Sequence, residues 1–441
     1  MRNIKHFPAI DGNLGWFELA PDYHKPIGTR LKGAHEFDFI IIGAGFTGLS
    51  AAHRLAELYP SLKIAVVEAL CVGEGTSGRN AGFIIDIPHN VDGGKPNVAN
   101  DKMLYALNNF AIDRLHNFQK QSGDDCYWHH AGKYLAARET HNCAHLDEFV
   151  QQLENMGLSY EVLNAQETQK RLGTDYYQRS VYTSGNILVN PAALIRAVAK
   201  CLPKNVTLFE KSPVISYDYG DKVRLETLGG SITGNFLIKA AHVYNEQFGE
   251  FKNHVAPVYT YASLTRPLTD DELEAASLKG IEPWGVTSAH WTGTTVRFTN
   301  DKRIFIRNIL EPSVLLHSNE VKLQKIYKKL RQLFAKRFPA LKNVEFDYTW
   351  GGMIGITLNQ NSVFQKTQSN VLVLNGCNGV GLSKGTFLGY YAAEFIDGKT
   401  SEELTFLQKH SRPSWIPPEP FLSLGVHARL KFEINKGGED I

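Results

Sequence analysis

The sequence predicts an α/β fold in which a Rossmann-type domain is interrupted by an inserted α+β domain with a mixed or antiparallel sheet. Three observations predict this arrangement. Residues 37–69 read as strand, glycine turn, helix and second strand. Residues 255–308 contain short runs rich in β-branched and aromatic residues, which are typical of strands. Residues 371–399 return to the opening pattern, so the first domain is expected to be discontinuous.

The glycine turn follows an apolar strand at residues 37–42 and precedes an amphipathic helix. Gly43 permits a tight turn, Gly45 lets a pyrophosphate approach bare backbone, and Gly48 lets helix and strand pack closely. The helix directs its free N–H groups and its positive dipole end toward the phosphates. A second strand, residues 63–67, ends in Glu68, whose carboxylate can accept both hydroxyls of an adenosine ribose. This complete pattern predicts a dinucleotide site for FAD or NAD rather than NADP.

The composition is that of an ordinary globular protein of two or three domains, with 441 residues, 43% hydrophobic and 21% charged. A net charge of +2 gives no support to a nucleic-acid partner. The five cysteines show no CxxC pair and no zinc-like spacing, so we expect free thiols in a reducing compartment and no metal site. No leader-like segment and no apolar run of ~18 residues is visible, so the simplest expectation is a cytoplasmic protein without a transmembrane segment.

Between the first helix and residue 255, the elements are read from periodicity. Residues 1–36 read as an irregular arm lying on the next domain, or alternatively as a mobile tail. Residues 73–83 are expected to form neither helix nor strand, but a polar loop rich in N–H donors, or a plain surface loop. Helices are expected at 101–121, 143–156 and 190–202, and Pro191 takes the first position of the last one. Strands are expected within 128–137 and at 207–209, 214–217, 223–227 and 231–238.

The β-rich segment that follows is expected to form a wall over the cofactor and therefore the substrate domain. Helix 320–337 has an apolar side and a strongly basic side, for which a solvated face is favoured over a membrane or an acidic partner. A strand at 346–349 runs into Trp350 and two glycines. We expect an arm at 1–36, a cofactor domain built from 37–100, 190–250 and 350–441, and a substrate domain built from 101–189 and 251–349.

The closing segment 371–399 presents a second helix N-terminus to a ligand, after a loop with Gly376, Gly379 and Gly381. NAD dehydrogenases usually complete their nucleotide site within one contiguous domain, whereas a flavin is held along its whole length. A helix N-terminus near residues 379–383 could stabilise negative charge on a reduced flavin ring. The separated motifs therefore favour FAD over NAD.

Four segments, GAGFTGLSAA, GTSGRNAGF, TWGG and NGCNGVGLSKG, resemble the FAD-dependent amine and amino-acid oxidase family, which contains glycine oxidase, sarcosine oxidase and D-amino-acid oxidase. The segments PDYHKPIGTRLKG, TRPL, VRFTNDKRIFIR and WIPPEPF resemble its gamma-glutamylputrescine oxidoreductase branch. The resemblance covers nearly the whole chain. Its motifs are specific for the family and not for a substrate.

The resemblance implies contacts with the pyrophosphate and ribose near the first turn, with the adenine at Val214, and with the flavin at the two later glycine motifs. The implied FAD-binding residues are Gly43, Gly45, Phe46, Thr47, Gly48, Glu68, Ala69, Thr76, Ser77, Gly78, Arg79, Asn80, Ala81, Gly82, Val214, Gly352, Gly376, Asn378, Gly379, Val380, Gly381, Leu382 and Ser383.

The sequence departs from the family pattern at three places. Lys384 stands where a small or aliphatic residue is usual, and its cation could stabilise charge at flavin N1 and O2 or cap the helix. No cysteine follows Trp350 at the position where some relatives attach the flavin, so noncovalent FAD is expected. The family's ATNAY segment has become AAHVYNEQF, in which Asn245 is a partial match.

The implied reaction removes a hydride from the carbon beside an amine nitrogen and passes it to flavin N5, after which the imine hydrolyses to an aldehyde or keto acid. The substrate would be a small amine or amino acid, with a gamma-glutamylputrescine-like amine the leading candidate. The substrate-domain candidates are Tyr259, Tyr261, Arg297, Arg307 and Trp350, with His89 weaker. Aromatic rings could enclose an amine, and an arginine could hold a carboxylate bidentately, although residues of these types on strands more often belong to the core than to a pocket.

Two alternatives stay open at the level of sequence. The first is a flavin dehydrogenase that passes electrons to a quinone or carrier protein instead of oxygen. The second is a flavin-binding protein without turnover, against which the intact TWGG strand and full inserted domain argue. An NADPH-dependent monooxygenase is disfavoured because no second GxGxxG occurs in a strand–helix context. The sequence indicates neither the electron acceptor nor the oligomeric state.

Overall fold

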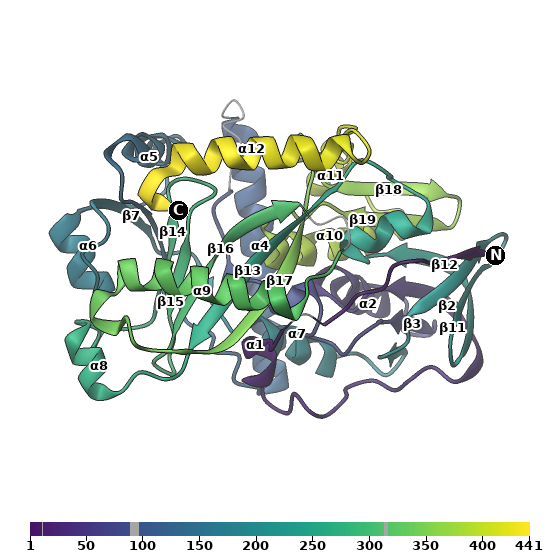
Figure 1. The fold of residues 1–441 in the computed structure, drawn as a ribbon. Coiled ribbons are helices and arrows are strands. Elements are labelled where there is room, and N and C mark those ends of the chain that lie inside the picture. The colour runs from purple at the N-terminus through teal and green to yellow at the C-terminus, as the bar shows by residue number, and fades with distance from the viewer. Residues whose placement is uncertain (11, 89–96, 313–315) are drawn as a thin grey trace.

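Two large sheets organise the chain, and helices cover and join them (Figure 1). The computed structural model describes residues 1–10, 12–88, 97–312 and 316–441. Strands of the nine-stranded sheet come from both ends and the middle of the chain, and strands of the eight-stranded sheet come from two intervening stretches. The expected mixed α/β architecture is confirmed.

The nine-stranded sheet is parallel at its centre. β2 (Gly33–Ile42) lies between β3 (Ile64–Val67) and β12 (Gly230–Lys239), and β3 is followed by β9 (Val206–Phe209). β19 (Val371–Asn375) adds a further parallel strand beside the end of β12. The antiparallel members are β1 (Arg2–Asn3), β10 (Val214–Tyr219), β11 (Val223–Thr227) and β18 (Val363–Gln368). The carboxyl-terminal parts of the central strands are buried, because helices or other strands cover both faces there.

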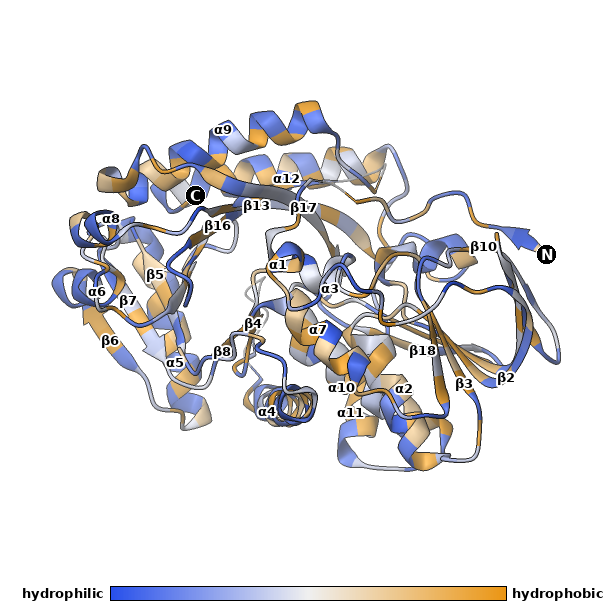
Figure 2. Ribbon diagram, turned by 90° about the horizontal axis from the view of Figure 1, so that it is seen from below, coloured by the Kyte–Doolittle hydropathy of each residue, from blue (hydrophilic) through white to orange (hydrophobic). Residues whose placement is uncertain are grey.

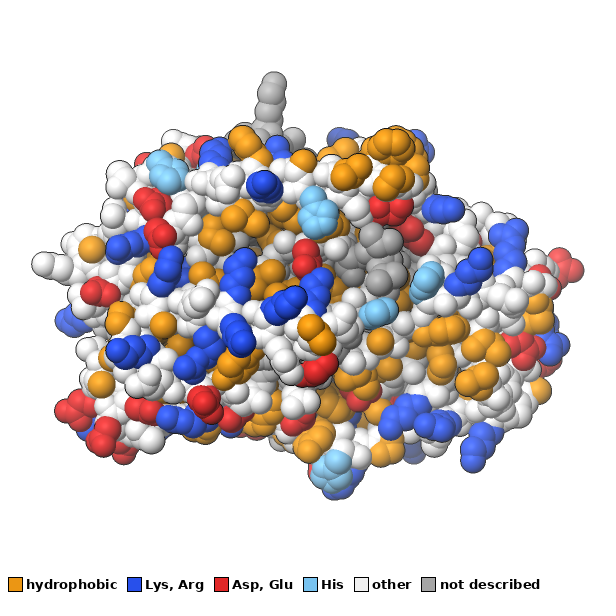
Figure 3. Space-filling view, in the orientation of Figure 1, with side chains coloured by type: hydrophobic (Ala, Val, Ile, Leu, Met, Phe, Trp, Pro, Cys, Tyr) orange, Lys and Arg blue, Asp and Glu red, His pale blue; other side chains and the backbone are white. Residues whose placement is uncertain are grey.

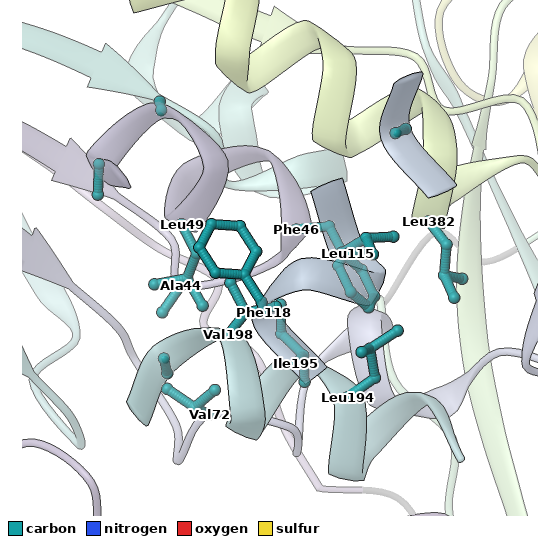
Figure 4. Packing of buried hydrophobic residues seen from close by; sticks show 14 of the residues in the cluster. Ala44, Phe46, Leu49, Val72, Leu115, Phe118, Leu194, Ile195, Val198 and Leu382 are labelled. Atoms are coloured by element: carbon teal, nitrogen blue, oxygen red, sulfur yellow. The ribbon is translucent and has the colours of Figure 1, made fainter. Parts of the chain in front are cut away.

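Helices α2 (Phe46–Leu58) and α10 (Gly381–Ile396) pack tightly against each other beside this sheet. A Cβ atom on Gly389 would lie 2.1 Å from the carbonyl oxygen of Thr47, so glycine permits the close approach. α1 (Gly15–Glu18), α3 (Thr76–Arg79), α4 (Val98–Ser122), α7 (Pro191–Lys200) and α11 (Glu402–Lys409) complete this part. Figure 4 shows side chains of α2, α4 and α7, including Leu49, Leu115 and Ile195, interdigitating in one core.

The eight-stranded sheet has the order β17–β13–β16–β15–β14–β5–β7–β6. Its strands are β5 (Lys133–Ala137), β6 (Glu161–Asn164), β7 (Arg179–Thr183), β13 (Ala256–Thr265), β14 (Trp284–Ser288), β15 (Thr295–Phe298), β16 (Ile304–Pro312) and β17 (Phe346–Ile356). Only the β14–β5 pair is parallel among these strands, so this sheet is mixed and mainly antiparallel. A separate short pair joins β4 (Phe83–Ile84) and β8 (Ile187–Leu188).

Helices α9 (Glu320–Arg337) and α12 (Phe421–Gly437) run along the outside of β13, β16 and β17 (Figure 2). α5 (Cys143–Met156) and α6 (Ala165–Leu172) lie farther out on the same sheet, and α8 (Asp270–Ala275) packs against the 3₁₀ turn Pro339–Leu341. The helix predicted at 320–337 is confirmed as α9, which buries Leu323, Ile326 and Leu330 and exposes lysines on its opposite side (Figure 3). Within the described residues, no helix has the length and apolar character that crossing a membrane would need.

Several predictions of local structure were wrong in extent or kind. The segment 73–83, for which neither helix nor strand was expected, contains the one-turn helix α3. Tertiary contacts stabilise this turn; for example, the backbone N–H of Phe46 donates to Ser77 Oγ at 3.2 Å. The arm at 1–36 contains β1 and α1 and ends in the first residues of β2. The strand predicted at 346–349 continues to Ile356 because β13 pairs with its whole length. α11 and α12 were not predicted.

Candidate active site

A cavity lies where the carboxyl ends of β2, β3, β12 and β19 face strands β13, β16 and β17 of the second sheet. Segments far apart in sequence form its wall: the β2–α2 turn, the loop carrying α3, the start of β10, the segment after β12 and the β19–α10 loop. In open α/β sheets, ligands bind outside the carboxyl ends of the parallel strands. The cavity therefore lies at the expected position for a dinucleotide.

The β2–α2 turn requires its glycines. Gly43 has a φ of +100°, and a Cβ atom there would lie 2.6 Å from the carbonyl oxygen of Ala240. A Cβ on Gly45 would lie 2.7 Å from Ser77 Oγ, and one on Gly48 would lie 1.9 Å from the carbonyl oxygen of Gly43. Gly43 and Gly45 line the cavity, whereas Gly48 serves the packing of helix on strand. The turn thus exposes backbone where a pyrophosphate would need it.

Glu68 lies directly after β3 and lines the same cavity. Its carboxylate accepts hydrogen bonds from the backbone N–H of Ala44 at 2.8 Å and of Leu70 at 2.9 Å. Burial raises the pKa of Glu68. A carboxylate can accept about four hydrogen bonds, so two bonds to the backbone leave acceptor positions for ribose hydroxyls.

The helix N-termini at the cavity differ from most others in the chain. The N-cap residues of α2 and α10, Gly45 and Val380, supply no capping side chain; Ser77 Oγ accepts from the first N–H of α2, and residues at both N-termini line the cavity. By contrast, Asn97, Asn190 and Asn319 cap α4, α7 and α9. Uncapped N–H groups and the positive dipole end favour an anionic ligand. The cavity is therefore suited to phosphate at α2 and to a negatively charged ring edge at α10.

Arg79 and Trp350 join the α3 loop to the second sheet. The Arg79 guanidinium donates to the carbonyl oxygens of Glu74 at 2.6 Å and Gly351 at 2.9 Å, and Trp350 Nε1 donates to the Arg79 carbonyl oxygen at 3.1 Å. Trp350 is fully buried, packs on Trp16 and lies outside the cavity wall. Its position is that of a core residue which fixes the loop.

Most of the predicted FAD-binding residues converge on the cavity. Those in its wall are Gly43, Gly45, Phe46, Thr47, Glu68, Ala69, Thr76, Ser77, Arg79, Asn80, Ala81, Val214, Gly352, Gly376, Gly379 and Gly381. Those outside the wall are Gly48, Gly78, Gly82, Asn378, Val380, Leu382 and Ser383. The residues of the second group are neighbours in sequence of those in the wall and support the backbone there. Asn378, for example, accepts from the N–H of Thr357 and donates to the carbonyl oxygen of Gln360, both at 2.8 Å.

The two predicted substrate arginines have different surroundings. Arg297 donates to the carbonyl oxygens of Ala81 at 2.6 Å and Val189 at 2.9 Å, and it lies outside the cavity wall. Arg307 lines the cavity and donates to Thr295 Oγ1 at 2.9 Å. Burial lowers the pKa of Arg307 to about 10, so the side chain is still charged at neutral pH. No carboxylate pairs with Arg307 within the described parts of the chain, so its charge is directed to the cavity.

The two predicted tyrosines lie on β13 with ring centroids 5.0 Å apart. Tyr259 lines the cavity, and Gly351 makes room for it, because a Cβ atom on that glycine would lie 2.0 Å from the tyrosine ring. Tyr261 lies outside the cavity wall, where its hydroxyl donates to the carboxylate of Glu311. The geometry favours Tyr259 as the pocket residue.

The other candidates lie around the cavity or outside the described residues. Lys384 Nζ is 3.5 Å from the carbonyl oxygen of Gln360, and burial lowers the pKa of Lys384 to about 8. Asn245 accepts from the N–H of Ala241 and donates to the carbonyl oxygen of Leu374, so it joins the ends of β12 and β19. Neither residue belongs to the cavity wall. His89 lies outside the described residues.

Sequence reasoning missed several wall residues, above all His242 and Cys377. His242 Nε2 is 3.4 Å from Cys377 Sγ. A usable signal was present for both: His242 follows the carboxyl end of a parallel strand, and Cys377 lies inside the glycine motif before α10. The wall also includes His6, Phe7 and Pro8 of the arm, which β1 fastens to β10.

Comparison with known proteins agrees with this geometry. The probable oxidoreductase OrdL of Haemophilus influenzae is 26% identical over 408 residues, 89% of each chain. Gamma-glutamylputrescine oxidoreductase of Escherichia coli is 24% identical over 399 residues, 87% of this chain and 88% of that protein. The crystal structure of glycine oxidase from Geobacillus kaustophilus superposes with a TM-score of 0.71 at 16% identity, covering 83% of this chain and 96% of that one.

Residues 38–395, most of the chain, match the DAO family, described as FAD dependent oxidoreductase. The uncapped helix N-termini, the glycine turn and the carboxylate after β3 fit the phosphates and the ribose of FAD. The chain therefore belongs to the DAO family of FAD-dependent oxidoreductases, and FAD is its cofactor.

Proposed function

We propose that this oxidoreductase oxidises the C–N bond of a small amine or amino acid that also carries a carboxylate. The observation that supports this most directly is Arg307, a half-buried cation without a carboxylate partner in the described residues, in the part of the cavity formed by the second sheet. A substrate carboxylate would supply the missing partner through charge-assisted hydrogen bonds. The reacting amine would then be held at a fixed distance from that anchor.

FAD would be bound noncovalently along the cavity. Gly43, Gly45 and the N-terminus of α2 would hold its pyrophosphate, Glu68 its ribose, and Gly379 and Gly381 the pyrimidine end of the flavin. When bound, FAD supplies the hydride acceptor for oxidation of the carbon beside the amine nitrogen. The imine product would hydrolyse to an aldehyde or keto acid.

The residues of the second sheet would bind and orient the substrate. Tyr259 and Met353 supply apolar surface on β13 and β17, and Leu316 continues it beyond β16. This surface would exclude water and place the substrate C–H bond, while Arg307 fixes the opposite end. We also propose that residues 101–189 and 251–349, apart from α4, form the substrate domain, since β5–β7 and β13–β16 share one sheet whereas α4 packs on α7 and α10.

A gamma-glutamyl amine is the leading substrate class. Such a molecule carries an α-carboxylate at one end and an oxidisable primary amine at the other, as the Arg307 anchor requires. The 24% identity to the gamma-glutamylputrescine oxidoreductase of E. coli supports this choice. The electron acceptor is proposed to be oxygen, with a quinone or carrier protein as the second candidate.

The deciding experiment is anaerobic mixing of the purified holoenzyme with a panel of amines, followed through the visible absorption band of FAD. The panel would hold gamma-glutamyl amines, polyamines, N-methyl amino acids and D-amino acids. Rapid bleaching by carboxylate-bearing amines, and not by the same amines without the carboxylate, is the expected result. Rapid return of colour in air would identify an oxidase, whereas bleaching by none of these compounds would contradict the proposal.

A further inference from the structure

Cys377 lies in the wall of the cofactor cavity, in the loop between β19 and α10. Its Sγ is 3.4 Å from His242 Nε2. The backbone N–H of Gly355 donates to the same nitrogen at 3.2 Å. Because an N–H group only donates, Nε2 is the acceptor and the imidazole proton lies on Nδ1. The Cys377 thiol shares this lone pair with the Gly355 N–H, so transfer of the thiol proton to His242 requires the bond from Gly355 to lengthen.

The surroundings of the thiol favour its anion. The loop leads into α10, a helix of 16 residues whose N-terminus has no side-chain cap. Two titratable side chains face the sulfur: His242 after β12 and Lys384 in the first turn of α10. Burial alone would raise the pKa of Cys377, but the neighbouring His242 and backbone hydrogen bonds at Gly379 and Gly355 lower it to about 6.

The other four cysteines have the opposite character, and all five are free. Burial raises the pKa of Cys71 to about 11 and that of Cys126 to about 12. Burial also raises the pKa of Cys143 and of Cys201, both of which are partly accessible. The directions of these shifts and the contact with His242 favour Cys377 as the nucleophilic thiol among the five cysteines. Accessibility does not explain the difference.

We propose that the Cys377–His242 pair is a modification site that reacts with hydrogen peroxide in the wall of the cofactor cavity. The sulfur attacks one peroxide oxygen, the O–O bond breaks and an S–O bond forms. Sulfur loses two electrons, and the departing hydroxide takes the proton held by His242 and leaves as water. The balance is Cys–SH + H₂O₂ → Cys–SOH + H₂O.

The proposal rests on the proposed function in one respect: amine oxidation with oxygen as acceptor would generate peroxide at this cavity. Gly376 and Gly379, on either side of Cys377, also line the cavity. An oxygen atom added to the sulfur would occupy space in this wall. The consequence would be a reversible loss of FAD retention and activity when peroxide accumulates.

The first test is a brief iodoacetamide pulse on the holoenzyme at a series of pH values, with the five cysteine peptides mapped by mass. At neutral pH, Cys377 should be alkylated at least about 10-fold faster than Cys143 or Cys201, because the thiolate is the reactive form. His242→Asn, and separately His242→Gln, should move the midpoint of Cys377 alkylation upward while the FAD band shows that the fold persists. Equal rates at Cys377 and Cys143, or an unchanged midpoint in both variants, would overturn the proposal.

The second test exposes the holoenzyme to hydrogen peroxide in the presence of dimedone, which marks sulfenic acid. The expected adduct is on the Cys377 peptide, accompanied in the absence of dimedone by FAD loss that dithiothreitol reverses. Cys377→Ser should retain its FAD under peroxide, whereas Cys143→Ser should behave as wild type. Equal sensitivity of the Cys377→Ser variant, or an adduct elsewhere, would refute the assignment. Since neither test uses an amine, their outcome is independent of the substrate proposed above.

Discussion

At the scale of single residues, the charge on Arg307 has the clearest functional consequence. Its guanidinium is held by Thr295 and faces the cavity, and no carboxylate neutralises it in the portion of the chain that the structure describes. Even a half-buried cation loses part of its hydration, and a bound anion can compensate for that loss. The bound substrate is the group that would pair with it, so binding should depend strongly on this side chain.

We expect Arg307→Gln to raise KM for carboxylate-bearing amines by roughly 10- to 100-fold, the equivalent of about 1.5–3 kcal/mol for hydrogen bonds to a charged group. The kcat value should change much less, because the anchor lies away from the reacting carbon. Steady-state kinetics with substrates that have and lack the carboxylate would measure the effect. Arg224→Gln, an exposed change on β11, is the matched control. An equal rise in KM for both substrate types would contradict the clamp.

His53 gives the fold a dependence on pH. It lies on α2, where its Nε2 is 2.9 Å from the carbonyl oxygen of Val198 and its ring packs on Phe118. Burial lowers the pKa of His53 to about 4. Between that value and the ordinary pKa of about 6.5, the unfolded chain binds a proton that the folded chain does not, so stability falls as the pH is lowered through this window.

We therefore expect the unfolding free energy of His53→Gln to fall less on acidification than that of the wild type, by up to about 3 kcal/mol between pH 6.5 and pH 4. Urea unfolding at a series of pH values would measure the difference. His35→Gln, a change on the exposed part of β2, controls for the loss of an ordinary histidine. Parallel pH profiles of wild type and His53→Gln would show that other groups set the acid sensitivity.

At the scale of elements, α7 connects the arm to the core of the cofactor domain. Asn190 caps this helix by accepting from the N–H groups of Ala192 and Ala193 at 3.0 Å, and its amide donates to the carbonyl oxygen of Trp16 at 2.8 Å. The residue is almost fully buried. A cap of this kind stabilises two elements at once, because α1 and α7 share it.

We expect Asn190→Ala to cost roughly 2–4 kcal/mol of unfolding free energy, combining a lost cap with a buried carbonyl left without its donor. Asn319→Ala removes the cap of α9, where Asn319 Oδ1 has one donor among the described residues, the N–H of Lys322, so this change should cost about 1 kcal/mol. Denaturant unfolding of both variants gives the comparison. Equal costs would mean that the contact with Trp16 contributes nothing.

Local patterns in the sequence were sufficient for α2, α7 and α9, because each has a cap or turn signal followed by a clear apolar face. They were insufficient for α12, which exposes Phe421 and Phe432 yet buries Glu433, so its apolar residues do not mark its inner face. The glycine-rich α3 forms through contacts with distant segments. Local propensity cannot report such contacts.

The candidate site, like the fold, was predictable where the signal lies in neighbouring residues and not where it depends on distant ones. The glycine turn after β2, the acidic residue after β3 and the glycine loop before α10 can each be recognised from neighbouring residues in the sequence. In the structure these segments meet in the cavity. Arg297 and Arg307 could not be separated, because the groups that hold Arg297, at Ala81 and Val189, are more than 100 residues away. His242 was missed for a similar reason, since its partner Cys377 lies 135 residues away.

At the scale of the whole molecule, one buried cluster spans both sheets, while the second sheet also has a buried cluster of its own. Ala262, Leu264 and Phe305 of the second sheet belong to the same buried cluster as Leu49 of α2 and Leu388 of α10. Trp16 stacks on Phe305 with ring centroids 5.4 Å apart, which adds the arm to that cluster. Shared burial of this kind couples the stability of both parts.

The end of the chain extends this coupling to the far side of the second sheet. The carboxylate of Asp440 accepts from the N–H of Arg138 at 2.6 Å, the N–H of Glu139 at 3.1 Å and Asn142 Nδ2 at 2.6 Å. Asp440 is buried and fastens the end of α12 to β5 and α5. Asp440→Ala should therefore cost roughly 3 kcal/mol, since hydrogen bonds to a buried charge are lost together.

These two features predict one cooperative unfolding transition for the whole chain. FAD at 100 times its dissociation constant should stabilise the folded state by about 2.7 kcal/mol, and Asp440→Ala, distant from the cavity, should lower the same transition that FAD raises. Glu439→Ala is the control, because its ion pair with Lys336 is exposed and should contribute little. Calorimetry of apo and FAD-loaded protein, wild type and variants, would test this. If Asp440→Ala lowered the temperature of one transition while FAD raised that of a separate one, the shared core would not couple the two sheets. The second sheet could then unfold while the cofactor remained bound.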